Sequence, residues 1–241
     1  MISFCSVTNK GGRSHNEDAM EVLVEDNRWC CILADGLGGM GGGADASEAV
    51  VETLKQCFQS GYMNENTLHA CCMKAHEAVI EKKNALHQLG QMYATVVLVY
   101  GTAERLYWTH CGDSRLYLFC DDTICYLTKD HSVPQMLVNC GEISQNEIRF
   151  HPDRNRLLSC LGNPEQEPNL SAIGAMDVRS GLTGLLCSDG FWELLTEAQM
   201  LQMLDDSEDV GMWVKKMVGR IRRMPMDEKM DNYSVIGLWV H

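Results

Sequence analysis

Five aspartates border apolar runs of the type that forms β-strands. They are Asp18 in RSHNEDA, Asp35 in ADG, Asp113 in CGDSR, Asp189 in CSDG and Asp231 in MDNYSV. Aspartate is common in turns for local reasons, and each of the five alone would be interpreted as a turn residue. Five together favour a site, because a carboxylate at a strand end can project beyond the sheet edge. Glycine follows Asp35 and Asp189 and, lacking a side chain, admits a close ligand.

The chemistry that suits such a cluster is divalent-cation binding. Carboxylates gathered at one edge of the sheets repel one another unless a positive charge lies among them. Ligation by oxygen alone favours Mg²⁺ or Mn²⁺ over zinc or copper. Two ions close together can clamp a phosphoryl group and produce hydroxide from water near neutral pH. Arg13, three residues before Asn16, supplies a planar two-pronged donor that suits phosphate.

The elements that must position these residues follow from the spacing of apolar side chains. Segments rich in β-branched and aromatic residues predict strands at 2–8, 28–34, 94–100, 105–112, 115–120, 123–128, 182–188 and 233–240. Helical spacing predicts helices at 44–59, 66–89, 132–140, 144–149, 197–204 and 208–223. Connections as short as GTAE and DD predict hairpins. We therefore expect packed antiparallel sheets with helices covering their outer faces.

Length and composition narrow the class of protein. The 241 residues contain no linker of biased composition, so we expect a single domain over 1–241. A formal charge of -13 argues against a nucleic-acid partner, because such affinity comes mainly from Lys and Arg. No apolar segment approaches the roughly 20 residues needed to span a bilayer. The start MISFCSVTNKGGR lacks the features of a secretion signal, which favours the reducing cytoplasm.

The 12 cysteines do not form a metal-ligand pattern, since no CxxC occurs among them. We interpret most of them as small buried apolar residues, because several lie in strand-like runs.

Eight motifs together resemble a known family. RSHNEDA, ADGLGGMGGG, ATVVLVY, HCGDSRLYL, LTKDHS, RLLSCLG, LLCSDGFWELL and DNYSVIGLWV occur in the order, and near the spacing, of motifs of the PPM (PP2C-like) metal-dependent serine/threonine phosphatases. The resemblance extends from about residue 2 to residue 240. The compact length and the stretch 141–162 resemble the bacterial branch of that family.

The resemblance implies a fold and a set of site residues. The fold is α+β, a four-layer αββα sandwich of two antiparallel sheets flanked by helices, with the metal site in a cleft at one end. Residues matching the catalytic two-metal core are Asp18, Asp35, the carbonyl of Gly36, Asp189 and Asp231. Asp113 matches a residue that, with Asp189, helps to hold a third ion. Arg13 matches the phosphate-binding arginine, and Glu17 a supporting group that binds water.

The resemblance also implies an activity. It is hydrolysis of phosphoserine and phosphothreonine in proteins by a metal-bridging hydroxide, with Mn²⁺ or Mg²⁺ as two core ions and a third. The expected partners are phosphorylated proteins, including a serine/threonine kinase and its substrates, and the expected state is a monomer. The alternative is a catalytically silent module that binds phosphoproteins on the same fold. Cysteine-dependent phosphatases are excluded, since no Cys-x5-Arg occurs.

The chain departs from the family pattern after its first Asp-Gly. Many eukaryotic relatives carry a histidine there, proposed as the acid for the leaving alcohol, whereas this chain has Leu37. A lone exposed His15 is expected to face solvent, and His131 to anchor the turn before a helix. The glycines of 36–43 lack the GKS or GKT ending of a nucleotide-binding loop, so we expect close packing beside the metal site. Residues 132–160 match a mobile flap beside the cleft, or else an ordinary surface loop.

Overall fold

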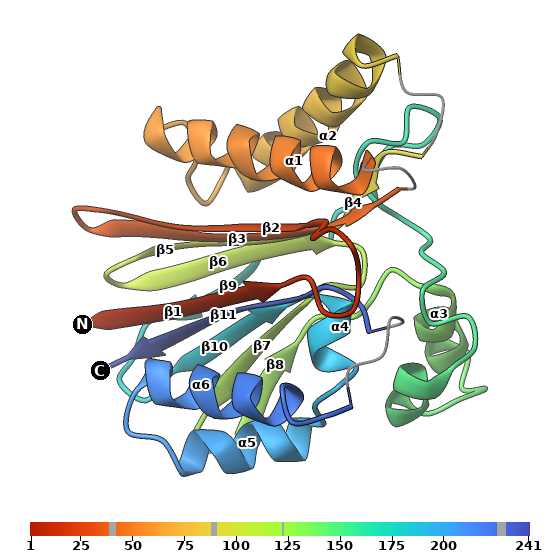
Figure 1. Ribbon diagram of the computed structural model, residues 1–241. Helices are drawn as coiled ribbons and strands as arrows, with labels where there is room; N and C mark the ends of the chain where they lie inside the picture. The colour runs from red at the N-terminus through yellow and green to blue at the C-terminus, as the bar shows by residue number, and fades with distance from the viewer. Residues whose placement is uncertain (39–41, 88–90, 122, 226–229) are drawn as a thin grey trace.

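Two antiparallel β-sheets pack face to face in the computed structural model, which describes residues 1–38, 42–87, 91–121, 123–225 and 230–241 (Figure 1). The first sheet has the order β1 (Ile2–Asn9), β11 (Tyr233–Val240), β10 (Thr183–Cys187), β7 (Arg115–Cys120) and β8 (Thr123–Leu127). The second has the order β2 (Asp18–Glu25), β3 (Arg28–Leu37), β5 (Val96–Thr102), β6 (Arg105–Cys111) and β9 (Gly174–Asp177), and β4 (Tyr93–Ala94) pairs with the end of β3.

Helices cover the outer face of each sheet, so the predicted four-layer αββα sandwich is confirmed (Figure 1). Helices α1 (Gly42–Gln59) and α2 (Leu68–Ala85) cover the second sheet, and α5 (Glu197–Asp205) and α6 (Val210–Ile221) cover the first. The short α4 (Asp189–Trp192), α3 (Val133–Asn139) and the 3-10 helix η2 (Gln145–Phe150) lie toward one end. Among the described residues, no helix is both long and apolar enough to cross a bilayer.

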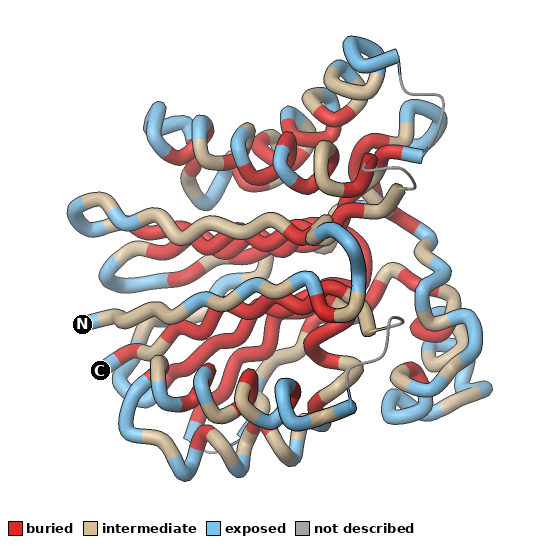
Figure 2. The backbone as a smooth tube through the Cα atoms, in the orientation of Figure 1, coloured by how far each residue is buried: buried red, intermediate tan, exposed pale blue. Residues whose placement is uncertain are grey.

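The core occupies three levels because alternate residues of a strand point to opposite faces. In β3, Leu33 packs between the sheets, whereas Ile32 packs against α1 and α2. In β10, Leu186 packs between the sheets and Leu185 under α5 and α6. The central strands are therefore buried on both faces, which explains their continuous apolar sequences. Figure 2 shows this burial along the strands of both sheets.

Several elements differ from those that the sequence predicts. Strands β2 and β9 and helix α4 were not predicted, and the helix expected at 66–89 is shorter, at Leu68–Ala85. Residues 88–90 of that prediction lie outside the described residues. Most cysteines are buried free thiols, as expected. However, Cys120 of β7 and Cys125 of β8 are joined by a disulfide, a pairing that the sequence analysis did not include.

One buried ion pair ties the start of β7 to the segment after β8. The guanidinium of Arg115 donates two hydrogen bonds of 2.8 Å to the carboxylate of Asp130. Their side chains are only 3% and 1% exposed. The guanidinium also lies 3.5 Å from the centre of the Trp192 ring, and Glu197 is 3.7 Å from it. Removing one member of such a pair leaves an uncompensated buried charge.

We predict that Asp130→Asn lowers the free energy of unfolding by about 3 kcal/mol. This value is near the low end of the losses found when one member of a buried ion pair is removed, because Glu197 remains near Arg115. The matched control is Asp177→Asn, which removes an ion pair between exposed Arg105 and Asp177 and should change stability by less than about 1 kcal/mol. Urea unfolding of both variants measures the difference. Equal effects would contradict the prediction.

Candidate active site

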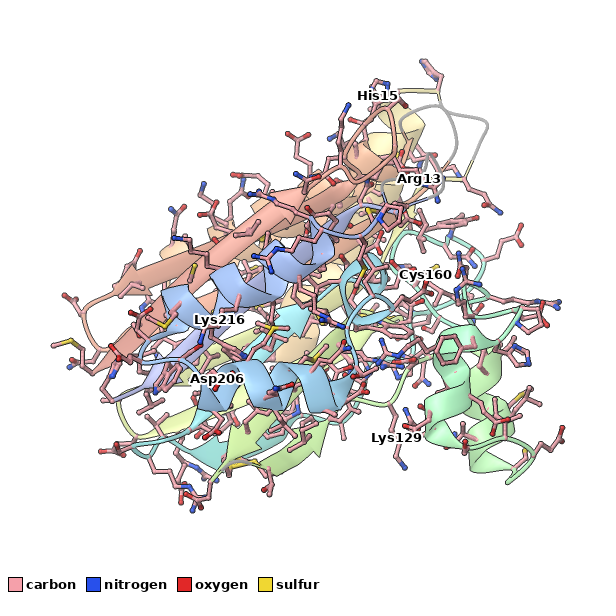
Figure 3. The ribbon with its side chains drawn as sticks, turned by 60° about the horizontal axis from the view of Figure 1, so that its bottom comes forward. Arg13, His15, Lys129, Cys160, Asp206 and Lys216 are labelled. Carbon is pink, nitrogen blue, oxygen red and sulfur yellow. A yellow bond between two sulfur atoms is a disulfide. The ribbon has the colours of Figure 1, made fainter. Side chains whose placement is uncertain are left out.

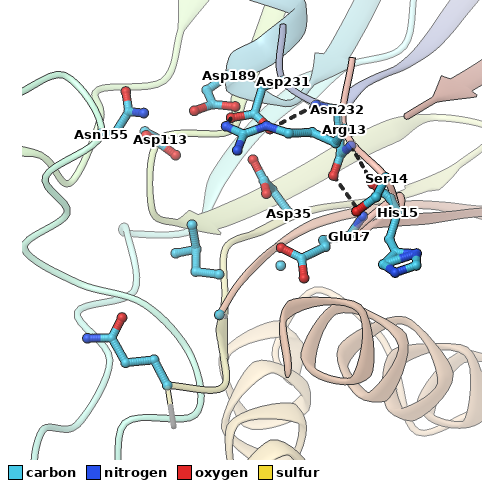
Figure 4. Close-up of a pocket in the computed structure, with 14 residues that line it drawn as sticks. Arg13, Ser14, His15, Glu17, Asp35, Asp113, Asn155, Asp189, Asp231 and Asn232 are labelled. Atoms are coloured by element: carbon cyan, nitrogen blue, oxygen red, sulfur yellow. Dashed lines mark hydrogen bonds and ion pairs between the residues drawn. The ribbon is translucent and has the colours of Figure 1, made fainter. Parts of the chain in front are cut away.

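The strand ends that carry the five aspartates meet at one end of the sandwich. Asp18 begins β2, Asp35 lies near the end of β3, Asp113 lies between β6 and β7, Asp189 begins α4 after β10, and Asp231 precedes β11. Four of these residues face one cavity of about 440 Å³ (Figure 4). It is lined by Arg13, Ser14, His15, Glu17, Asp35, Gly36, Leu37, Gly38, Gln91, Asp113, Asn155, Asp189, Asp231 and Asn232.

Asp18 lies behind the cavity wall and is 9% exposed. It stands directly opposite Asp35 in the β2–β3 ladder. Its Oδ2 accepts a hydrogen bond of 2.9 Å from the Ser188 hydroxyl, whereas its Oδ1 is buried and has no partner in the described part of the chain. A buried acceptor without a partner is costly. One oxygen of Asp18 is therefore available to a ligand.

Backbone packing explains why glycine stands at each of the two Asp-Gly corners. A Cβ on Gly36 would lie 2.0 Å from the carbonyl oxygen of Gly43, and one on Gly190 would lie 2.1 Å from that of Asn232. The first corner is also held by Thr95, whose hydroxyl accepts a hydrogen bond of 3.0 Å from the Asp35 amide. Only glycine allows these close approaches. Packing was expected for the glycines of 36–43, of which 39–41 lie outside the described residues.

Helix α4 links Asp189 to Asp113. Asp189 is the first residue of the helix, and the indole N–H of Trp192, its last residue, donates a hydrogen bond of 2.9 Å to the carbonyl of Asp113. Asp113 is 4% exposed. The backbones of Asp189 and Asp113 are thus tied together by the aromatic side chain that also stacks on Arg115.

The segment 10–17 is held against the start of β11 by Asn232. Its side-chain oxygen accepts a hydrogen bond of 2.8 Å from the Glu17 amide, and its side-chain nitrogen donates to the carbonyls of Lys10 and His15, each at 2.9 Å. Arg13 then lies 2.8 Å from Asp231, with which it forms an ion pair at the cavity mouth. Arg13 was predicted from the sequence, whereas Asn232 was not, because its hydrogen bonds join residues far apart in the chain.

The carboxylates share a strongly unfavourable electrostatic environment. Burial raises the pKa of Asp18 to about 6 and the pKa of Asp189 to about 7, and the charge of Asp231 adds to both increases. Burial also raises the pKa of Asp35 and of Asp113 well above the ordinary value. Neighbouring charges add to these increases, with Asp18 acting first on Asp35 and Asp189 on Asp113. Each carboxylate is therefore easier to ionise when a cation is close.

The residues fit the divalent ions that the family motifs imply. All the acidic donors are oxygen atoms, as Mg²⁺ and Mn²⁺ prefer, and Asp18 Oδ1 is a buried acceptor without a partner in the described chain. Among the described residues, no three Asp, Glu, His or Cys side chains already form a closed ligand set. Asp231 is paired with Arg13, so its ligation of an ion would require release from that ion pair.

Other residues singled out in the sequence lie in and around the cavity. Leu37 lines it, so the position after the first Asp-Gly offers no titratable group. His15 is at the mouth, and its ring points away from the aspartates (Figure 4). His131 stacks on His110 and accepts a hydrogen bond from the Gly112 amide, so it supports the turn with Asp113. Asn155 brings part of the 132–160 segment to the cavity.

Comparison with known proteins identifies the family. The model of the protein phosphatase 2C family matches residues 9–233. The chain belongs to the protein phosphatase 2C family. The serine/threonine phosphatase stp of Listeria innocua is 31% identical to it over 199 residues, which make up 80% of this chain and 78% of that protein. The chain is therefore a metal-dependent protein serine/threonine phosphatase, as its motifs imply.

Solved structures agree with this family membership. The serine/threonine phosphatase PstP/Ppp of Mycobacterium tuberculosis has a TM-score of 0.86 and 26% identity, covering 100% of this chain and 99% of that one. The catalytic domain of the serine/threonine protein phosphatase PstP in complex with 2 manganese ions has a TM-score of 0.81 and 26% identity, covering 99% and 98%. The expected fold and family are both confirmed.

We predict that Asp189→Asn stabilises the phosphatase in the presence of EDTA, by about 1–3 kcal/mol at pH 8. Burial raises the pKa of Asp189 to about 7, so ionising its carboxyl costs more free energy in the folded than in the unfolded protein. This cost is absent below about pH 4, where the carboxyl is protonated in both states, and it grows as the pH rises toward 7. Asparagine does not titrate, so the advantage of the variant should grow over this range. Urea unfolding at pH 5 and pH 8 measures it.

Saturating Mn²⁺ provides the control for this prediction. It should reverse the order of stability at pH 8, because a ligand that binds the native state stabilises the protein that binds it better. An advantage of Asp189→Asn that is the same at both pH values would contradict the prediction.

Proposed function

We propose that this phosphatase hydrolyses phosphoserine and phosphothreonine in proteins at the cavity between the sheets. Asp18, Asp35, the carbonyl of Gly36, Asp189 and Asp231 hold two core ions, Mn²⁺ or Mg²⁺, and Asp113 helps Asp189 to hold a third. The observation that carries the proposal is the meeting of five strand-end carboxylates from both sheets at a site that also contains Arg13. Such a set of charges favours cations, and cations favour a phosphate.

Bound divalent ions would supply positive charge to the phosphoryl oxygens and lower the pKa of the attacking water. The chain's own residues position the substrate. Arg13 exchanges its hydrogen bond to the carboxylate of Asp231 for hydrogen bonds to two oxygens of the phosphate, which a planar guanidinium can bind together. Asn232 keeps the Arg13 segment in register with β11. Glu17, half-buried at the cavity wall, orients water there.

A catalytically silent phosphoprotein-binding module is the alternative. The presence of every core aspartate favours the enzyme, since binding alone does not need so many buried carboxylates that raise one another's pKa. Hydrolysis of an aryl phosphate that requires Mn²⁺ and is abolished by a chelator supports the enzyme. Its absence in well-folded protein supports the module.

The setting of this activity follows from the same proposal. The substrates include a partner serine/threonine kinase and its targets, as the resemblance to the bacterial branch implies. In this proposal the phosphatase acts as a monomer. The many free cysteines suit a reducing compartment such as the cytoplasm.

We predict that Asp35→Asn reduces turnover of a phosphopeptide by at least about 10³-fold at saturating Mn²⁺, because the variant loses one metal ligand. The fold should be retained. The loss of one buried charge should leave the melting temperature in EDTA equal or higher. Asp177→Asn, which changes the net charge equally at an exposed site, is the control. Steady-state rates near those of the parent protein would contradict the role of Asp35.

We predict that Arg13→Lys lowers kcat/KM for a phosphopeptide by about 10- to 150-fold, which corresponds to about 1.5–3 kcal/mol for a lost charge-assisted hydrogen bond. Lysine keeps the charge but cannot donate two parallel hydrogen bonds to the phosphate. Most of the loss should fall in KM. The same kcat/KM in the two proteins would show that Arg13 does not bind the phosphate.

A further inference from the structure

A second large hollow lies between α6 and the edge strand β1, outside the active site. Its volume is about 1080 Å³. Cys5 and Val7 of β1 and Val214 and Val218 of α6 contribute apolar side chains to it, together with Met203 of α5. We call this hollow the α6 groove. Because β1 is the last strand of its sheet, the groove has no further strand beside it to close it.

The charge of the α6 groove is opposite to the charge of the chain. Among its described lining residues are the cations Lys215, Lys216, Arg220, Arg222 and Arg223, and none of the lining residues is acidic. Five of the chain's 20 Lys and Arg residues therefore line one groove of a protein with a formal charge of -13. Asp209 caps the N-terminal end of α6, opposite the end that Arg222 and Arg223 follow.

The α6 groove leads toward the active site. The C-terminal end of α6, with Arg222 and Arg223 directly after it, points to the same end of the sandwich as the segment with Arg13 (Figures 1 and 3). Val7 lies in the groove and Arg13 at the cavity mouth, so five residues lie between them and their Cα atoms are at most about 22 Å apart. An extended peptide covers that distance with about six or seven residues.

We propose that the α6 groove binds an acidic segment of the phosphoprotein substrate, with apolar residues among its carboxylates, about six or more residues from the phosphorylated residue. The inference rests on the proposed function and adds a substrate class to it. Carboxylates meet the cations of the groove, and apolar side chains cover its floor of valine and methionine. The segment raises affinity without touching the reacting phosphate.

A substrate segment fits this groove better than other anionic partners. No aromatic side chain is among its described lining residues, so it lacks the platforms on which nucleic-acid bases stack. Its apolar residues form the floor of a hollow, whereas membrane-binding faces present them outward. The groove also leads toward the active site, so one peptide can place its phosphate in the active site and its acidic segment in the groove.

The experiment compares two phosphopeptides with the same phosphothreonine core. One carries, beyond a six-residue spacer, a segment of alternating acidic and leucine residues, and the other has the matching amides. The spacer and segment are placed on each side of the core in turn. We expect kcat/KM for the acidic peptide to be about tenfold higher in low salt, mainly through KM, and the preference to shrink in 0.5 M NaCl because salt screens exposed charges.

Charge reversal separates the groove from general electrostatics. Lys215→Glu with Arg222→Glu should remove the preference and leave hydrolysis of 4-nitrophenyl phosphate unchanged. The control, Lys74→Glu with Arg179→Glu, makes the same change of charge at exposed cations outside the groove and should keep the preference.

Each other outcome overturns the inference. Equal kcat/KM for the two peptides, or a preference that survives in the groove variant, would show that the groove does not bind the segment. Equal peptide rates combined with groove-dependent binding to anionic vesicles would assign the groove to a membrane surface. Absence of any Mn²⁺-dependent hydrolysis, of 4-nitrophenyl phosphate as well as of both peptides, would instead contradict the proposed function.

Discussion

The rest of the structure depends on one unfavourable pairing, in which Asp18 and Asp35 stand opposite each other at the buried end of the β2–β3 ladder. Like charges directly across a ladder repel, and burial adds to the cost of ionising both. A sequence that keeps this pair must stabilise the surrounding backbone by other contacts. Thr95 and Ser188 do so from both sheets, since one accepts from the Asp35 amide and the other donates to the Asp18 carboxylate.

The outer part of the site has a separate support. Trp192 donates to the backbone of Asp113, and its ring is held by the guanidinium of Arg115, which Asp130 fixes by two hydrogen bonds. This support is buried and joins β7, α4 and the segment after β8. Because it bonds the carbonyl of Asp113 and not its carboxylate, both carboxylate oxygens stay available to ligands. The scaffold is thus rigid in the backbone and leaves the donor atoms free to rotate.

The sequence predicted those parts of the molecule that are determined by residue patterns within short segments. Apolar runs located the central strands, and strand-end aspartates located the site. Strand β2 was missed because Glu21 interrupts its short apolar sequence and acidic residues stand at both of its ends. Helix α4 was missed because four residues carry no helical period. Asn232 was missed for another reason, since the amide and carbonyls that it bonds lie more than two hundred residues earlier.

The distribution of charge sets a constraint on recognition that the fold alone does not. A phosphoprotein carries negative charge to a chain with a formal charge of -13, so long-range repulsion opposes their encounter, most strongly at low salt. Favourable electrostatics must then be local. Arg13 at the cavity mouth provides such attraction for the phosphate. The cations of the α6 groove, which also contains Cys5 and Val7 of β1, provide such attraction for other acidic groups of a partner. Because five of the 20 Lys and Arg residues line the groove, the rest of the chain has a larger excess of acidic residues, so charge influences the orientation of an anionic partner as well as its affinity.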